Sequence, residues 1–308
     1  MAVFLAAGVS TAGASERVDV NAVGPRLAVN ARGVAMVTYR ARGRTFHTLV
    51  WGAVDALPPS QTVPQVHFRV DWSGGWRSRH RLVWKTFKNR CRKYDGPALD
   101  YFIAGCKAPD GSYWALQAWQ PYLPHRGFPP WLPQQTQWEL HISHWRGPIA
   151  NLEVYTDWAF GGEAHDLFGR LTYGGNPVYG FGTGRNGAPG DRYGRGLYID
   201  TFNSAYGEGW KRETSTAFRT GSGAFCYSFW PTTDRTLPGY PNNPRPAGNG
   251  QRYRITVEGP GVTPIVMWEG AGLHNFDGSN PADVAYERSR DALFMQFLAN
   301  DKFCPSQR

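Results

Sequence analysis

The chain has 308 residues and a formal net charge of +9, with 33 Lys and Arg against 24 Asp and Glu. Aromatic residues make up 15% of it, and there are 37 Gly and 23 Pro. The aromatic load and the modest net charge exclude an intrinsically disordered chain, and Gly and Pro stay below the level typical of low-complexity sequence. The length allows one large domain or two small ones.

The first fourteen residues have the pattern of an export signal. A short apolar run from residue 2 to residue 9 precedes Ala12-Gly13-Ala14, a small-x-small cleavage pattern. We therefore predict that residues 1–14 are a signal peptide and that the protein is secreted. The apolar run is too short to span a bilayer, so we expect no membrane span.

Short runs rich in Val, Thr and Tyr follow, separated by glycines. They predict an N-terminal three-stranded meander within residues 15–56, with strands over residues 27–30, 34–40 and 45–54. Residues 57–64 contain three prolines and are interpreted as a linker. The main β-rich domain then extends over residues 65–308.

A basic segment begins the main domain. It holds eight basic residues and no acidic residue between Arg77 and Lys93, close to three tryptophans. A run of cations beside aromatic rings can hold a polyanion, whereas the plainer alternative is a solvated run of charge. The predicted polymer-binding residues are Trp72, Trp76, Arg77, Arg79, Arg81, Lys85, Lys88 and Arg92.

The conformation of the basic segment is left open by the sequence. In a helix, Arg81, Lys85, Lys88 and Arg92 would share one stripe. In an extended chain, alternate residues from Arg77 onward would line one side.

Two hairpins are predicted in the middle of the chain. Residues 101–106 and 112–119 flank Pro109-Asp110-Gly111, a strong turn signal. Residues 121–133 contain five prolines and predict an extended surface loop. Strands over residues 138–145 and 152–158 alternate clearly between apolar and polar positions and are joined through Gly147-Pro148.

The polar face of that second hairpin is the candidate catalytic site. With a symmetric loop, Glu139 would lie opposite Asp157, and His141 opposite Tyr155. Two facing carboxyl groups suit a glycosidase, and a His/Tyr pair beside arginines could transfer a proton in a lyase. The alternative is a solvated face with ordinary cross-strand pairs.

The sequence contains no motif that predicts a bound dinucleotide or metal ion. Residues 182–187 match G-x-G-x-x-G, but Pro189 and Gly190 follow and cannot open the helix that a dinucleotide site needs. His141 and His144 are three positions apart, which puts them on opposite faces of a strand and argues against a shared metal ion. We expect no metal and no cofactor.

The C-terminal half predicts more strands and one helix. The strands are expected at residues 177–181, 197–202, 214–218, 224–230, 252–257 and 263–268. The helix is expected over residues 281–300, with Asn280 as its N-cap and Pro281 at its first position. The predicted fold class is mostly β: an antiparallel sandwich or jelly-roll-like arrangement with one C-terminal α-helix.

Four cysteines are present: Cys91, Cys106, Cys226 and Cys304. An even number in an exported chain indicates two disulfides, for which three connectivities exist. We favour Cys91–Cys106, which is local, and Cys226–Cys304, which would tie down the C-terminus.

Several strings resemble a group of secreted proteins from GC-rich actinobacteria that have no assigned function. They are WKTFKN at residues 84–89, APDGSYWALQ at 108–117, YGEGWKRE at 206–213 and PAGNG at 246–250. The likeness covers most of the chain after the signal peptide. It implies export, but it implies no activity, fold or site.

Three classes of function remain. The leading hypothesis is an exported, non-enzymatic β-rich protein that binds an extracellular polymer, either an acidic polysaccharide or a cell-wall glycan. The alternatives are a polysaccharide-active enzyme, hydrolase or lyase, and a structural surface or matrix protein. Nucleic acid is not the expected partner, and the oligomeric state stays open.

Overall fold

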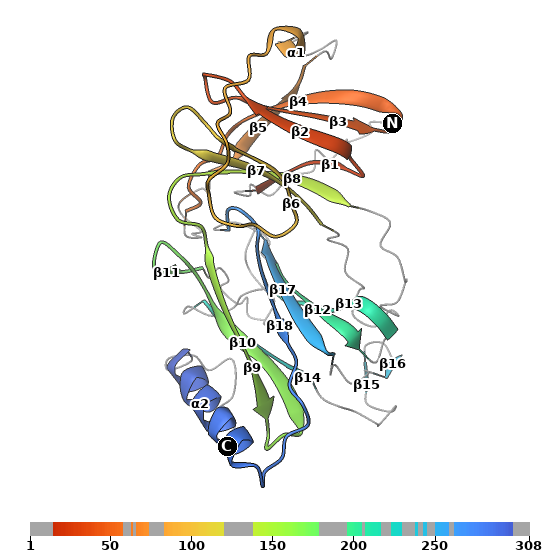
Figure 1. The fold of residues 1–308 in the computed structure, drawn as a ribbon, viewed down its shortest axis with the longest axis vertical. Helices are drawn as coiled ribbons and strands as arrows, with labels where there is room; N and C mark the ends of the chain where they lie inside the picture. Colours follow the sequence, from red (N-terminus) through yellow and green to blue (C-terminus); the bar gives the residue numbers. More distant parts are fainter. Residues whose placement is uncertain are drawn as a thin grey trace, which may run out of the picture.

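The structure is a computed structural model. It describes residues 15–57, 63, 66–73, 83–119, 138–178, 196–204, 207–216, 223–229, 238–239, 243–244, 250–258 and 262–297. It confirms the predicted fold class, since antiparallel sheets make up most of the described chain and a helix follows them (Figure 1).

The N-terminal half is a sandwich of two four-stranded sheets. The strand order is β2-β3-β4-β5 in one sheet and β1-β8-β7-β6 in the other. A shared core that includes Val37, Trp114 and Ile142 fills the space between them. The strands are β1 (Ser15–Val20), β2 (Val23–Val29), β3 (Ala35–Ala41), β4 (Arg44–Gly52), β5 (Phe68–Trp72), β6 (Phe102–Lys107), β7 (Tyr113–Trp119) and β8 (Glu139–Trp145).

The C-terminal half has a second core of its own. One sheet has the order β11-β10-β14 with β9 also paired to β10, and the other has the order β13-β12-β17-β18. Leu167, Ile199 and Ile255 are fully buried between the two sheets. The strands are β9 (Asn151–Ala159), β10 (Ala164–Tyr173), β11 (Asn176–Pro177), β12 (Gly196–Ser204), β13 (Gly207–Thr216), β14 (Ala224–Phe229), β17 (Arg252–Glu258) and β18 (Val266–Ala271), and a separate ribbon pairs β15 (Pro238–Gly239) with β16 (Asn243–Pro244).

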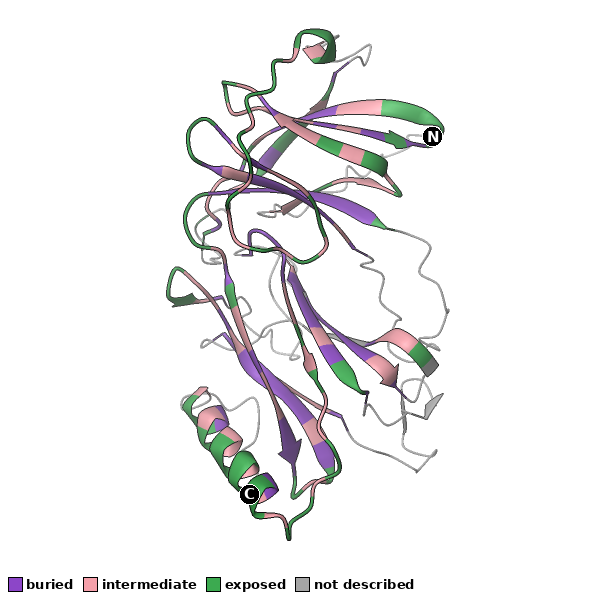
Figure 2. Cartoon of the chain, viewed as in Figure 1, coloured by how far each residue is buried: buried purple, intermediate pink, exposed green. Residues whose placement is uncertain are grey.

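The two sandwiches lie end to end (Figure 1). Gln117 of β7 joins them, because its side-chain amide donates to the carbonyl of Ile265 at 3.0 Å and accepts from the Ile265 N–H at 3.1 Å. Gln117 is 1% exposed, so this contact between the halves is dry. Figure 2 shows that buried residues concentrate on the central strands of each sandwich.

Helix α2 (Pro281–Phe297) covers the outer face of β9 and β10, and it ends close to the expected boundary. Asn280 is its N-cap, as predicted: its side-chain oxygen accepts the N–H of Ala282 at 3.0 Å. Phe294 packs against Phe168 of β10, with 5.1 Å between the ring centroids. Among the described residues, no helix has the length and apolar character to cross a membrane.

The predicted hairpin over residues 138–158 is wrong. Both strands form, but β8 pairs with β1 and β7, whereas β9 pairs with β10 in the other sandwich. The polar face expected in water is also wrong for β8, because every one of its residues is buried. The residues between β8 and β9 therefore cross from one sandwich to the next and do not form a tight reversal.

The predicted meander forms as β2, β3 and β4, and two further strands extend the N-terminal sandwich. β5 follows the proline-rich segment and pairs with β4, so the sheet continues across residues 57–64. β1, which precedes the meander in the chain, pairs with β8, more than a hundred residues away.

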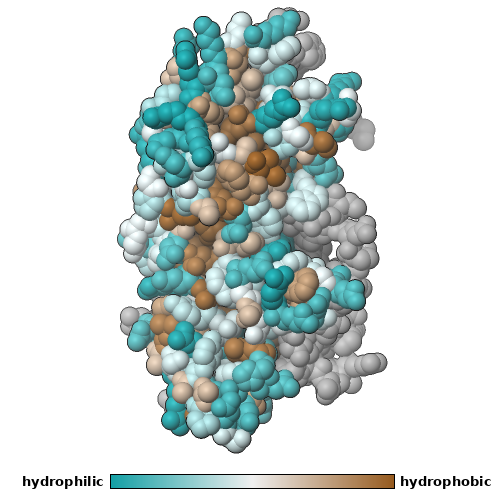
Figure 3. Space-filling view, in the orientation of Figure 1, coloured by the Kyte–Doolittle hydropathy of each residue, from teal (hydrophilic) through white to brown (hydrophobic). Residues whose placement is uncertain are grey.

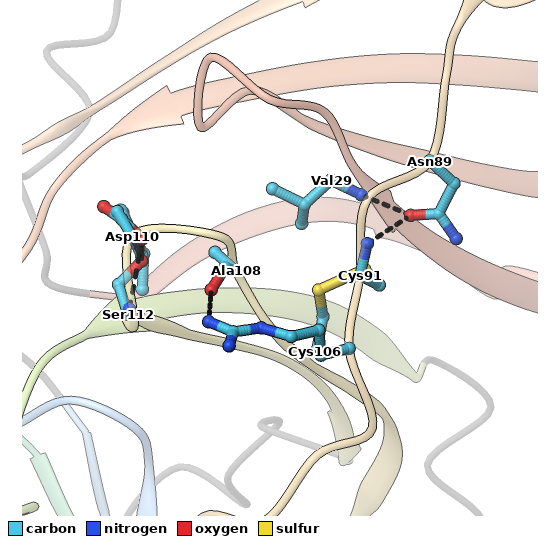
Figure 4. The surroundings of a disulfide bond; sticks show 9 residues. Val29, Asn89, Cys91, Cys106, Ala108, Asp110 and Ser112 are labelled. Atoms are coloured by element: carbon cyan, nitrogen blue, oxygen red, sulfur yellow. Dashed lines mark hydrogen bonds between the residues drawn. A yellow bond between two sulfur atoms is a disulfide. The ribbon is translucent and has the colours of Figure 1, made fainter.

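The local disulfide is confirmed: Cys91 is bonded to Cys106 (Figure 4). Beside it, the Asn89 side-chain oxygen accepts the N–H groups of Val29 and Cys91 at 3.1 and 2.9 Å, which fixes this segment to β2. Cys226 is also disulfide-bonded. Its expected partner, Cys304, lies outside the described residues, as do residues 1–14, 121–133 and 182–187.

Candidate functional site

The described part of the basic segment is anchored on the edge of the first sheet. Its short helix, α1 (Val83–Thr86), is followed by non-helical chain, so the helical stripe through Lys88 and Arg92 does not form. The N–H of Trp84 donates to Ser73 Oγ at 2.7 Å, and its indole stacks on the His47 ring at 4.8 Å and 4°. These contacts hold Trp84 in one orientation on the sheet.

Two tryptophans are exposed at this edge. Trp72 is 60% exposed and Trp84 is 39% exposed, which is unusual for such large apolar rings. Trp72 lies opposite Thr48 in the β4–β5 ladder, and neighbouring His47 points to the other face. The sheet edge therefore presents one indole on each of its faces.

The cations of the predicted site do not all play the same part. Lys85 and Lys88 are exposed, and Lys85 Nζ lies 5.5 Å from the Trp84 ring centroid. The guanidinium of Arg92 donates instead to the carbonyls of Ala108 and Pro109, at 2.9 and 3.3 Å. Trp76, Arg77, Arg79 and Arg81 lie outside the described residues.

Of the predicted catalytic residues, Glu139 and His141 lie together on β8. The carboxylate of Glu139 accepts hydrogen bonds from Arg17 of β1 at 2.6 Å and from His141 Nε2 at 2.9 Å. The His141 ring stacks on Trp119 of β7, with centroids 3.9 Å apart. Glu139 and His141 are each 7% exposed, so this is a buried ionic group.

The electrostatics of this group favour an ionised Glu139. Burial alone would raise the pKa of Glu139, but the hydrogen bonds from His141 and Arg17 outweigh it and lower that pKa. An ionised Glu139 forms a hydrogen bond with His141 Nε2, which orients the imidazole ring. Nδ1 is buried and has no hydrogen-bond partner in the described part of the chain.

Tyr155 and Asp157, the other two predicted catalytic residues, lie in the other sandwich. They are on β9, on the face covered by α2, where Tyr155 stacks on Phe168 at 5.6 Å. Asp157 lies directly opposite Asp166 of β10 and not opposite Glu139. The structure thus divides the four residues into two separate pairs.

Sequence reasoning missed a second buried ionic group, on β12 and β13. Arg212 Nε donates to Asp200 Oδ1 at 2.5 Å and Arg212 Nη2 donates to Oδ2 at 3.0 Å. The Arg212 guanidinium also lies 4.7 Å from the ring centroid of Tyr198, whose hydroxyl donates to Glu258. Alternation along β12 places Tyr198 and Asp200 on one face, but no local signal identifies Arg212 as the partner.

The charge of Glu139 acts on Tyr198 across the junction of the sandwiches. Burial raises the pKa of Tyr198, and the charges of Glu258 and Glu139 raise it further, so its phenol stays protonated. In the described ranges, no set of three His, Cys, Asp or Glu side chains could hold a metal ion.

The sequence matches no protein-family model, no curated protein and no solved structure.

Proposed function

We propose that this chain is an exported protein that binds an anionic extracellular polymer, such as an acidic polysaccharide or a cell-wall glycan, without cleaving it. The observation that carries the proposal is the exposed edge formed by Trp72, Trp84, Lys85 and Lys88. Indole faces stack on the C–H faces of sugars, and ammonium groups attract acidic substituents.

The anchoring of Trp84 supports this proposal. Its backbone is held by Ser73 and its ring by His47, so little conformational entropy remains to be lost when a ligand stacks on it. The lysines extend into water, where their attraction for a polyanion is screened by salt. We therefore expect retention that weakens as the ionic strength rises.

Affinity chromatography on immobilised polygalacturonate and on neutral dextran tests the proposal. The wild type should be retained on the acidic polymer at low ionic strength. The Lys85→Glu/Lys88→Glu double variant and Trp84→Ala should each be retained much less. Because all three residues are exposed or partly exposed, these variants should fold normally.

Two variants serve as matched controls in the other parts of the surface. Arg288→Glu reverses an exposed charge on α2, and Trp138→Ala removes a ring that is 47% exposed. Both should be retained as strongly as the wild type. Equal retention of the test variants and the wild type would contradict the proposed surface.

A polysaccharide-active enzyme, hydrolase or lyase, is the second candidate. It is favoured by the Glu139–His141 pair, in which a carboxylate orients the imidazole and Nδ1 has no hydrogen-bond partner among the described residues. Appearance of reducing ends or unsaturated sugar from the retained polymer, lost in His141→Gln, would support it. Retention without any product favours the binding protein.

A further inference from the structure

Helix α2 is fastened to the second sandwich mainly through aromatic side chains. Phe297 lies 5.9 Å from the ring of Tyr155, and Phe294 is buried against Phe168. Near the start of the helix, the hydroxyl of Tyr286 donates to the carbonyl of Thr156 on β9 at 2.8 Å. Figure 1 shows the helix lying alongside β9 and β10.

Between these contacts the interface is acidic. Asp157 of β9 and Asp166 of β10 are direct cross-strand partners, so their side chains are neighbours on one face. That face is the one under α2, because Asp157 alternates with Tyr155. The two aspartates are 2% and 3% exposed.

The helix adds two more carboxyl groups to this surface. Glu287 and Asp291 lie one turn apart on α2, and the charges of both act on Asp157. The interface therefore brings together carboxyl groups from β9, β10 and α2.

The basic side chains near this interface that the structure describes contact other groups. The Arg290 guanidinium lies 5.3 Å from the ring centroids of Tyr155 and Tyr286. Arg170 of β10 donates to Glu153 at 3.3 Å, and Arg288 is exposed, where its charge acts on Glu287.

The histidines near this interface are also engaged elsewhere. His274 pairs with Asp283 at the start of the helix at 2.8 Å, and His165 points to the opposite face of β10, toward Tyr253. Asp157 itself accepts the N–H of Trp158 at 2.9 Å. This donor favours the ionised form of Asp157, whereas the charges of Asp291, Asp166 and Glu287 oppose that form.

Protonation relieves this repulsion. Burial, with added repulsion from Asp291, Asp166 and Glu287, raises the pKa of Asp157 to about 8. Burial likewise raises the pKa values of Glu287 and Asp291. With α2 in place, Asp157 is therefore protonated at neutral pH, whereas in water it would be ionised.

We propose that α2 is a proton-dependent clasp, which stays docked on β9 and β10 while the Asp157 cluster holds protons and separates from the sheet as they are lost. Separation would uncover the aromatic surface of Tyr155 and Phe168. The device is independent of the polymer-binding edge, which lies in the other sandwich.

The sign of the pH dependence follows from linkage. The pKa of Asp157 is higher in the docked state than in the separated state, so docking is strongest at low pH and weakens as the pH rises toward about 8. If Asp157 alone titrates, the equilibrium constant for separation of α2 from the sheet should rise about tenfold per pH unit between about pH 4 and pH 8, and then level off. From about pH 5 to about pH 7 we expect an increase of roughly a hundredfold.

Amide hydrogen exchange on the full chain, corrected for the intrinsic pH dependence of exchange, tests the clasp. In the wild type, protection of the α2 amides should fall between about pH 5 and about pH 7, relative to that of the β3 and β4 amides. Asp157→Asn, which resembles the protonated side chain, should keep α2 protected at both pH values. Asp95→Asn, an exposed change in the other sandwich, should behave as the wild type.

Two results would overturn the proposal. One is protection of α2 in the wild type that does not change between the two pH values. The other is an Asp157→Asn variant whose α2 loses protection with pH as the wild type does. If that variant does not fold, Glu287→Gln on the partly exposed side of the helix should reduce the pH slope, and an unchanged slope refutes the clasp equally.

Discussion

Removal of the Asp200 charge should destabilise the second sandwich more than any surface charge change. Asp200→Asn keeps the size of the side chain but leaves the Arg212 guanidinium without its carboxylate. The two side chains are only 8% and 6% exposed, so water cannot easily replace the lost partner. Breaking one side of a buried ion pair costs about 3–5 kcal/mol.

Because Arg212 retains its contact with the Tyr198 ring, we expect the lower end of that range, about 3 kcal/mol. One kcal/mol shifts the melting temperature of a medium-sized domain by about 2–4 °C, so the expected loss is about 6–12 °C. Differential scanning calorimetry at constant pH measures it.

A double-mutant cycle separates the ion pair from simple loss of packing. Asp200→Leu/Arg212→Met removes both charges and should cost clearly less than the two single changes added together. The exposed pair of Arg252 and Glu269, at 3.4 Å, is the matched control, and Arg252→Ala should cost less than about 1 kcal/mol. If Asp200→Asn costs no more than this control, or if the single changes are additive, the reasoning fails.

Three further outcomes are expected from thermal or urea unfolding. Cys91→Ser/Cys106→Ser opens a disulfide with a sequence separation of 15 and should cost about 3 kcal/mol, whereas no change would show that the reduced chain is already constrained. Gly169→Ala places a Cβ 1.9 Å from the carbonyl oxygen of Glu153, so it should distort the β9–β10 ladder and cost about 1–3 kcal/mol, unlike Gly278→Ala, whose Cβ would lie 3.5 Å from the Phe276 ring, an ordinary contact distance. Tyr286→Phe removes the hydroxyl that donates to the Thr156 carbonyl and lies 3.4 Å from the Thr156 hydroxyl, so it should cost about 1 kcal/mol, and a loss near zero would show that water satisfies the carbonyl.

The surface of the molecule carries one further feature without an assigned role. Figure 3 shows apolar side chains gathered across the upper and middle part of one face, bordered by hydrophilic ones. The exposed apolar residues include Phe102 and Ile103 on the edge strand β6, at 42% and 44% exposure. Single exposed apolar residues are ordinary on protein surfaces, so only their clustering is of note.

The sequence by itself determined the features that depend on neighbours in the chain. Short runs rich in Val, Thr and Tyr between glycines predicted the strands of the meander, and the turn residues Pro109-Asp110-Gly111 predicted the hairpin of β6 and β7. Asn280 and Pro281 predicted the start of α2, since an N-cap acts within one turn. The Cys91–Cys106 bond followed from a short separation along the chain.

Only the tertiary structure decided which strands become partners. β8 and β9 alternate as the two strands of a hairpin would, yet β8 is buried between β1 and β7, and β9 joins β10. That choice depends on which surfaces bury the most apolar area, and these surfaces come from distant parts of the chain. This pairing separates the four predicted catalytic residues into two pairs. Glu139 lies beside Arg17, and Asp157 lies opposite Asp166 under the C-terminal helix.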